Sequence, residues 1–278
     1  MRTLLSGLAL GESPRWHDGR LWFANWGTGD VVAVDLDGKS EIVAHVPVTI
    51  PYSIDWLPDG RLLVVAKTRV LRLEPDGSLV THADLAEIDR NGYNEIVVDG
   101  RGNAYVNGGG FDLMAGEPFA PGYVVLVRPD GTATQVADGI AFGNGMAVTP
   151  DNSTLIVAES YGQRLTAFDI GPDGGLSNRR VWAALGDDPP DGICIDAEGA
   201  VWYATVPGKR CVRVREGGEV LASVEADRGC FACMLGGPDG TTLFVLAAEW
   251  RGIEGLDFGE RTGQVLVAEA PAPAAGYP

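Results

Sequence analysis

Four residues far apart in this chain carry side-chain oxygens that could together hold a metal ion: Glu12, Asn94, Asn144 and Asp191. Each of them opens a short apolar stretch that is typical of a β-strand. Two carboxylates would balance the charge of a divalent cation, and the two amides would add further oxygen ligands. Hard cations prefer such a set, so we expect one divalent cation, with Ca²⁺ first and Mg²⁺, Mn²⁺, Zn²⁺ or Fe²⁺ as alternatives.

Each of these residues also has a simpler interpretation. Asn144 and Asp191 both precede a glycine, so either one alone could be a turn former. Glu12 alone could be a solvated acid in a loop. Their equivalent positions in a repeat favour the ligand interpretation, and Asn94 is either a ligand or a substrate contact. We expect Glu95 to point away from the site, because neighbouring residues of a strand face opposite sides.

The repeat that relates these positions is a turn followed by an apolar strand, as in Pro58-Asp-Gly-Arg-Leu-Leu-Val. Its six copies are aligned on apolar residues separated by 41, 42, 51, 46 and 42 positions: Leu21, Leu62, Ala104, Leu155, Val201 and Leu243. A repeat of about 40 residues with several short strands is typical of a propeller blade. We therefore predict an all-β, six-bladed β-propeller with four antiparallel strands per blade, folded as a single domain over residues 1–278.

The repeat also predicts how the ring closes. The blades cover roughly residues 10–45, 51–84, 93–137, 143–184, 190–225 and 230–270. The sixth blade lacks a fourth strand, because the proline-rich tail after Glu269 is not expected to form one. Residues 3–9 are expected to supply that strand and to close the ring, which removes the exposed edges of an open arc.

Two long loops indicate the working face of the ring. The inner strands begin near the axis on one face, and the loops over residues 107–122 and 248–262 extend from that same face. Loops longer than about 12 residues in a compact fold are usually functional. From the residues on this face we expect six to contact a substrate: Asn94, Asn107, Tyr93, Trp26, Tyr161 and Glu117.

Composition excludes some functions. The net charge is −17, from 21 basic and 38 acidic residues, which argues against nucleic acid as a partner. No apolar run approaches the roughly 18 residues of a membrane helix, so no membrane association is expected. We interpret the first ten residues as a strand and not as a signal peptide. The four cysteines are interpreted as buried free thiols, which predicts a cytoplasmic protein.

Several motifs resemble the gluconolactonase/regucalcin (senescence marker protein) family of six-bladed propellers. They are Glu12-Ser-Pro-Arg-Trp16, Asn144-Gly-Met-Ala-Val-Thr-Pro-Asp151, Pro190-Asp-Gly-Ile-Cys-Ile-Asp196 and Gly236-Gly-Pro-Asp239. The resemblance implies that Glu12, Asn144 and Asp191 bind a catalytic divalent metal. Sugar-lactone members carry Arg-x-Asn-Asp where this chain has Gly92-Tyr-Asn-Glu95. This departure and the aromatic loops argue for a substrate less polar than an aldonolactone.

The function predicted from these residues is metal-dependent hydrolysis of a lactone or ester, with water attacking a carbonyl held at the metal. By resemblance, Asp191 is the candidate general base or nucleophile. No histidine is placed to form a serine-type triad. The alternatives are an organophosphate or aryl-ester hydrolase on the same metal, a non-catalytic calcium-binding propeller, and a lyase of the strictosidine-synthase kind.

Overall fold

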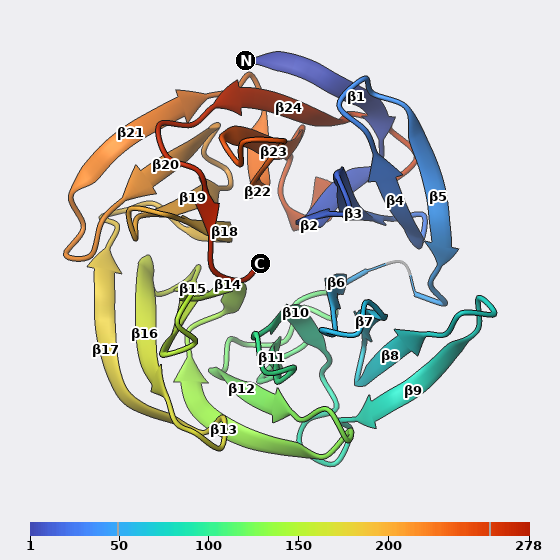
Figure 1. The fold of residues 1–278 in the computed structure, drawn as a ribbon, viewed down its shortest axis with the longest axis vertical. Helices are drawn as coiled ribbons and strands as arrows, with labels where there is room; N and C mark the ends of the chain where they lie inside the picture. The colour runs from blue at the N-terminus through green and yellow to red at the C-terminus, as the bar shows by residue number, and fades with distance from the viewer. Residues whose placement is uncertain (49, 256) are drawn as a thin grey trace.

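The computed structural model describes residues 1–48, 50–255 and 257–278, and most of them lie in short β-strands. The strands form six antiparallel sheets arranged in a ring around a central axis (Figure 1). The prediction of an all-β, six-bladed propeller is confirmed. In the described part of the chain the one helical element is the short 3₁₀ turn η1 (Ile253–Gly255).

Each blade is a meander of four strands that runs from the axis to the rim. The first three blades consist of β2 (Leu10–His17), β3 (Arg20–Trp26), β4 (Asp30–Val34) and β5 (Ser40–His45); β6 (Tyr52–Trp56), β7 (Leu62–Ala66), β8 (Arg69–Leu73) and β9 (Leu79–Asp84); and β10 (Tyr93–Val98), β11 (Ala104–Gly108), β12 (Gly122–Val127) and β13 (Ala133–Ile140). The last three consist of β14 (Gly143–Val148), β15 (Thr154–Glu159), β16 (Arg164–Ile170) and β17 (Leu176–Ala184); β18 (Pro190–Asp196), β19 (Val201–Thr205), β20 (Arg210–Val214) and β21 (Val220–Glu225); and β22 (Gly229–Gly236), β23 (Thr242–Ala248) and β24 (Gly263–Glu269) with β1 (Arg2–Leu8).

The sixth blade takes its outer strand from the beginning of the chain, as predicted. Strand β1 pairs antiparallel with β24, with Thr3 opposite Leu266. One apolar cluster seals this junction, because it joins side chains of blades five, six and one, including Trp202, Phe244 and Phe23. The two ends of the fold are therefore held both by a strand ladder and by a shared core.

The tail after Glu269 differs from the prediction. We expected no strand there, but β25 (Ala274–Ala275) pairs with the end of β18, and Tyr277 forms a bridge with Val148. The prolines of the tail lack N–H groups, but they keep carbonyl oxygens, and the residues between them keep both groups. Pro273 O accepts a bond from Ala197 N at 2.8 Å, and Ala274 N donates to Gly240 O at 2.9 Å. The expectation was wrong because a two-residue ladder needs only these few groups.

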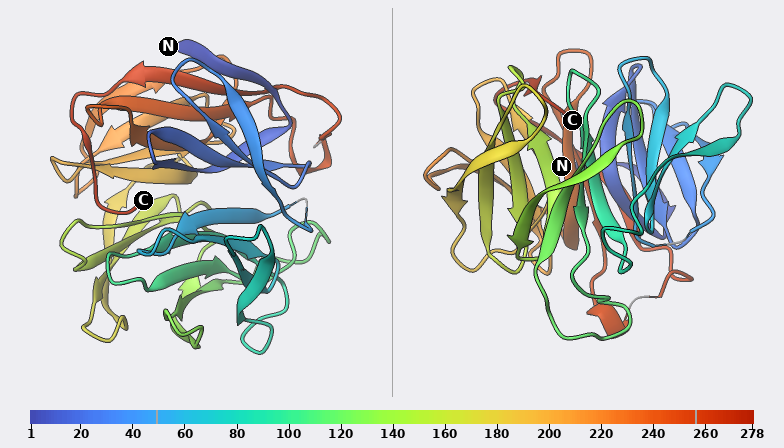
Figure 2. Two further views of the ribbon diagram at one scale, coloured as in Figure 1. Left: turned by 45° about the vertical axis from the view of Figure 1, so that its right-hand side comes forward. Right: turned by 90° about the horizontal axis from the view of Figure 1, so that it is seen from below.

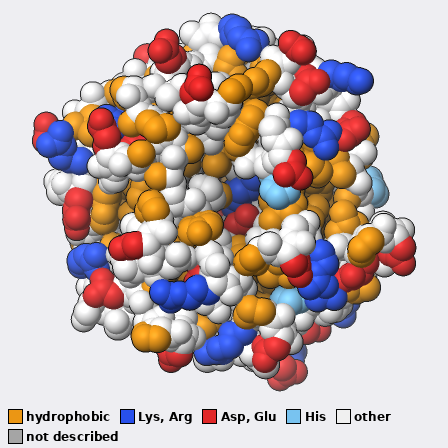
Figure 3. All heavy atoms as spheres, viewed as in Figure 1, with side chains coloured by type: hydrophobic (Ala, Val, Ile, Leu, Met, Phe, Trp, Pro, Cys, Tyr) orange, Lys and Arg blue, Asp and Glu red, His pale blue; other side chains and the backbone are white. Residues whose placement is uncertain are grey.

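The two faces of the ring are different. The loops between β11 and β12 and between β23 and β24 extend from one face, and the C-terminus lies at the other (Figure 2, right). The two loops therefore share a face, as predicted. On the C-terminal face, acidic and basic side chains are mixed around a central hollow (Figure 3). None of the described helices is long and apolar enough to cross a membrane.

Blade four contains a buried charged cluster that the repeat does not predict. Glu159 is fully buried and accepts bonds from Arg164 at 3.0 and 3.1 Å, from Arg179 at 3.0 Å and from Thr166 at 2.5 Å. Burial acts to raise the pKa of Glu159, but the hydrogen bonds outweigh it, so the pKa lies below its usual value. The ionised form of Glu159 therefore stabilises the fold.

All four cysteines are buried free thiols, as predicted. They belong to the apolar cluster at the junction of blades five, six and one. A free cysteine in such surroundings packs as a small apolar residue.

Candidate functional site

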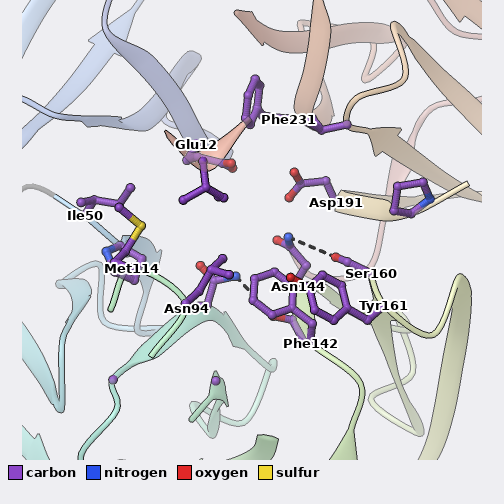
Figure 4. A pocket seen from close by; sticks show the side chains of 18 of the residues that line it. Glu12, Ile50, Asn94, Met114, Phe142, Asn144, Ser160, Tyr161, Asp191 and Phe231 are labelled. Atoms are coloured by element: carbon purple, nitrogen blue, oxygen red, sulfur yellow. Dashed lines mark hydrogen bonds between the residues drawn. The ribbon is translucent and has the colours of Figure 1, made fainter. Parts of the chain in front are cut away.

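A cavity of about 450 Å³ opens on the face that carries the long loops. All four of the predicted metal ligands line it: Glu12, Asn94, Asn144 and Asp191. Figure 4 shows their side chains gathered around one point, although they come from four different blades. The loops between β11 and β12 and between β23 and β24 contribute Met114 and Trp250 to the wall above them. The ring thus brings together residues up to 179 positions apart in the sequence, since Glu12 and Asp191 differ by 191 − 12.

β-Bulges direct these four side chains into the cavity. In each inner strand that carries one of them, the pairing with the next strand shifts at or beside that residue, for example between Glu12 and Arg15 in β2 and between Pro190 and Ile193 in β18. The inner strand of blade two, β6, pairs without a shift and supplies none of the four. A bulge bends the strand and re-aims a side chain. The register shifts therefore explain why residues of separate strands point at one place.

The glycines after Asn144 and Asp191 allow neighbouring blades to approach closely at the axis. A Cβ atom on Gly145 would lie 2.5 Å from Ile193 N and 2.7 Å from Asp191 O. A Cβ atom on Gly192 would lie 2.5 Å from the Cβ atom of Ala232. Asn144 and Asp191 themselves lie within β14 and β18, so the interpretation of either as a turn former is wrong. The glycines serve close backbone approach, which only glycine permits here.

The two carboxylates of the site repel each other in a buried setting. Burial raises the pKa of Glu12 well above its usual value, and the negative charges of Asp191 and Glu95 raise it further. Burial and Glu95 likewise raise the pKa of Asp191, against hydrogen bonds from Asn144 and from the N–H of Gly192. In the described structure the Oδ1 atom of Asp191 is buried and has no hydrogen-bond partner. A buried carboxylate without a partner is costly, and a cation would relieve both this cost and the repulsion.

The donor set fits a hard divalent cation. No group of three or more His, Cys, Asp or Glu side chains converges among the residues that the structure describes. A cation held at Glu12 and Asp191 would therefore also use amide oxygens. Asn94 Nδ2 donates to Gly143 O at 3.3 Å and Asn144 Nδ2 donates to Ser160 Oγ at 3.4 Å, so both amides keep Oδ1 as an acceptor. Oxygen ligands of this kind suit Ca²⁺, Mg²⁺ or Mn²⁺.

Ser160 is part of the site, although no motif in the sequence indicates it. It lines the cavity, and its Oγ donates to Pro190 O at 2.7 Å, next to Asp191. Its backbone N–H donates to Phe142 O at 3.0 Å. Ser160 therefore connects Asn144 of blade four to the strand that carries Asp191.

Glu95 does not line the cavity, in agreement with the expectation that it points the other way from Asn94, but its charge still reaches the site. Glu95 is buried, and its Oε1 accepts bonds from Ser13 Oγ at 3.0 Å and from Arg15 Nη2 at 3.2 Å. Its charge also acts on Glu12 and Asp191. The register shift between Tyr93 and Glu95 falls at Asn94, which lines the cavity, while Glu95 lies behind the wall. Arg15, which also lies 3.7 Å from Asp55, compensates this third acid.

The predicted substrate contacts divide into two groups. Asn94, Tyr93, Trp26 and Tyr161 line the cavity, and the Trp26 ring is held by a bond from Nε1 to Tyr52 O at 2.6 Å. The structure does not bring Asn107 and Glu117 to the wall. Asn107 lies behind it, fully buried, and donates from Nδ2 to Asn144 O at 2.5 Å. Glu117 accepts a bond from Asp112 N at 2.9 Å within its own loop.

The fold and this site define a six-bladed β-propeller with an oxygen-lined cavity on its axis. A family model described as the SMP-30/Gluconolactonase/LRE-like region matches residues 10–249, and the chain belongs to this family.

Relatives with known names agree with that assignment. The chain is 30% identical to regucalcin of Xenopus laevis, over 86% of this chain and 83% of that protein. It is 25% identical to a pentonolactonase of Haloferax volcanii, over 89% of this chain and 84% of that protein. A solved calcium-binding regucalcin of Agrobacterium tumefaciens superposes with a TM-score of 0.81 at 20% identity, covering 99% of this chain and 94% of that one. The last comparison concerns the fold alone.

Proposed function

We propose that this protein is a divalent-metal-dependent hydrolase that opens a lactone or cleaves an ester. The observation that carries the proposal is the pair of carboxylates, Glu12 and Asp191, at the floor of an open cavity, with the buried Oδ1 atom of Asp191 unpartnered. The name of the pentonolactonase relative supports lactone chemistry, and the calcium-binding regucalcin supports a divalent cation.

In this proposal, Glu12, Asn144 and Asp191 would hold the cation, and Asn94 would be either a fourth ligand or a substrate contact. Once bound, the cation would polarise the substrate carbonyl and lower the pKa of water. Glu95 stays with Arg15 and contributes negative charge from beneath the site. Asn107 donates to the backbone carbonyl of Asn144, and the side-chain amide of Asn144 donates to Ser160 Oγ, so the position of Asn144 is fixed before anything binds.

Asp191 is the residue that we propose moves the proton. Its carboxylate lies at the floor of the cavity, and its unpartnered Oδ1 atom is placed to accept a proton from an attacking water.

The test is a substrate panel on chelated protein to which Ca²⁺, Mg²⁺, Mn²⁺, Zn²⁺ or Fe²⁺ is returned one at a time. The panel holds lactones, aryl esters and a phosphotriester, and calorimetry measures cation binding in parallel. We expect lactone or ester turnover only in the presence of a bound cation. Cation binding without turnover of any of these would instead support the non-catalytic calcium-binding propeller. Turnover of the phosphotriester alone would support an organophosphate hydrolase.

We also propose that residues 1–278 fold as one domain in a reducing compartment such as the cytoplasm. The β1–β24 pairing and the four buried thiols support this. A single unfolding transition in urea, unchanged by a reductant, is the expected result.

A further inference from the structure

Apolar side chains make up most of the cavity wall around the carboxylates. Of the described residues that line it, only Glu12, Asp112 and Asp191 carry a charge, and no lysine or arginine is among them. Phe142, Tyr161, Phe231, Trp250, Met114 and Ile253 are representative of the wall. Apart from Asn91 and Asp112, the acid and amide side chains of the lining are those of the four predicted ligands, which lie together (Figure 4).

Several of the polar groups in the cavity are already bonded to the protein. Trp26 Nε1 donates to Tyr52 O, and Ser160 Oγ donates to Pro190 O. The Nδ2 atoms of Asn94 and Asn144 donate to blade four. A ligand with many hydroxyl groups would lose its water here and find few partners in return, which lowers affinity. A ligand with one polar end and an apolar body matches the same walls.

Aromatic rings continue this apolar surface to the outside. Phe142 and Tyr161 are stacked, with centroids 4.7 Å apart and planes at 16°, and Phe111 lies 5.8 Å from Phe142 and 5.5 Å from Phe119. Phe119 and Tyr161 are 48% and 52% exposed, and Met114 of the same wall is 52% exposed. Exposed apolar residues gathered at one place mark a binding surface.

The backbone at this rim also has an unusual conformation. Phe142 has a φ of 59°, in the left-handed region that bulky residues rarely adopt. Such a conformation persists only where the surroundings hold it, and it is found most often at functional sites. Here it turns the Phe142 ring onto Tyr161 at the mouth of the cavity.

We propose that the substrate is a lactone or ester that carries a bulky apolar group, alkyl or aryl, which lies along this aromatic wall while its carbonyl faces the carboxylates. Polyhydroxylated sugar lactones are then poor substrates. This inference rests on the proposed hydrolase function and adds the class of substrate to it.

The test measures kcat/KM of the cation-loaded protein on lactones with alkyl substituents of increasing length, beside a sugar lactone of the same ring size. Full burial of one methylene is worth about 0.8 kcal/mol, or a factor of about four, so we expect a rise approaching fourfold per methylene until the wall is covered. The sugar lactone is expected to fall at least roughly 100-fold below the best alkyl lactone, as a result of several unpaired hydroxyl groups. A flat series, or a sugar lactone as good as the alkyl lactones, would overturn the inference.

Matched variants distinguish an effect of the aromatic wall from a general effect of exposed hydrophobic residues. Phe119→Ser removes an exposed ring of the rim, and Ile42→Ser makes the same kind of change at a 65% exposed position on β5, an outer strand. We expect Phe119→Ser to reduce the dependence on chain length and Ile42→Ser to leave it unchanged. An equal effect of both variants would argue against binding of the alkyl chain at the rim.

A binding measurement makes failure of this inference distinguishable from failure of the hydrolase proposal. Alkyl lactams of increasing chain length, which resist hydrolysis, are titrated while the fluorescence of Trp26 and Trp250 in the wall is followed. Chain-length-dependent lactam binding without lactone turnover would refute the hydrolase proposal and support the apolar binding site. Turnover of sugar lactones, together with lactam binding that does not depend on chain length, would support the hydrolase proposal and refute the apolar substrate class.

Discussion

Replacement of Asp191 by asparagine tests the site in a single change. The Asp191 carboxylate is buried beside Glu12, and its Oδ1 atom has no partner in the described structure. The Asp191→Asn change keeps the shape of the side chain and removes the charge. An unsatisfied buried polar group costs about 1–3 kcal/mol, and more when it is charged. We therefore expect the metal-free variant to be more stable than the metal-free parent by about this amount.

The same change should abolish the increase in Tm that a bound cation produces. A ligand at 100 times its Kd stabilises a protein by about 2.7 kcal/mol. Each kcal/mol moves Tm by about 2–4 °C in a chain of roughly this size. The parent protein should thus gain about 5–10 °C from a saturating divalent cation. The variant should gain almost nothing, while its metal-free Tm lies about 2–12 °C above that of the parent.

Differential scanning calorimetry of chelated protein, with and without added cation, gives all four Tm values. Asp18→Asn is the matched control, because it makes the same change of charge at a residue whose side chain is 82% exposed. The control should behave as the parent does. An Asp191→Asn variant that melts below the parent without metal, or that keeps the full cation shift, would refute the reasoning about this site.

Three further changes test the surroundings of the site. Arg15→Met leaves Asp55 and Glu95 buried without the guanidinium group that neutralises them. It should lower the free energy of unfolding by about 3–5 kcal/mol, measured in urea. Because the pKa of Glu159 is lowered in the fold, its stabilisation is complete above its ordinary pKa of about 4.5 and is lost as pH falls through the lower folded value. Glu159→Gln should therefore be much less stable than the parent near pH 6, with urea midpoints that converge once the pH falls below the lowered pKa of Glu159. Gly145→Ala should cost about 1–3 kcal/mol by forcing blades four and five apart, and calorimetry should show weaker cation binding.

The fold could be predicted because the repeat appears in the sequence itself. A turn and an apolar strand recur six times, so both the number of blades and the closing role of residues 3–9 follow from the count. The tail strand β25 could not be predicted, because its two alanines pair with β18 only after the ring has formed. No local pattern of two residues between prolines indicates such a partner.

The site was partly predictable for a related reason. Glu12, Asn94, Asn144 and Asp191 hold equivalent places at the starts of inner strands, and the structure brings them to one cavity. The charge effect of Glu95 on the site was not predicted, because its ion pair with Arg15 joins strands of two different blades and has no local pattern in the sequence. Asn107 was predicted to contact a substrate, but it lies behind the wall. It belongs to β11, the second strand of blade three, and its side-chain amide donates to the backbone carbonyl of Asn144.

The pairing of β1 with β24 has a consequence for synthesis of the chain. Residues 2–8 leave the ribosome long before the strand that they join, residues 263–269. Throughout translation the incomplete arc keeps two unprotected sheet edges, which neighbouring polypeptides could use for aggregation. Early release of the nascent chain would thus yield blades without an enclosed centre, so premature termination anywhere before residue 263 should produce insoluble material in place of a partly active protein.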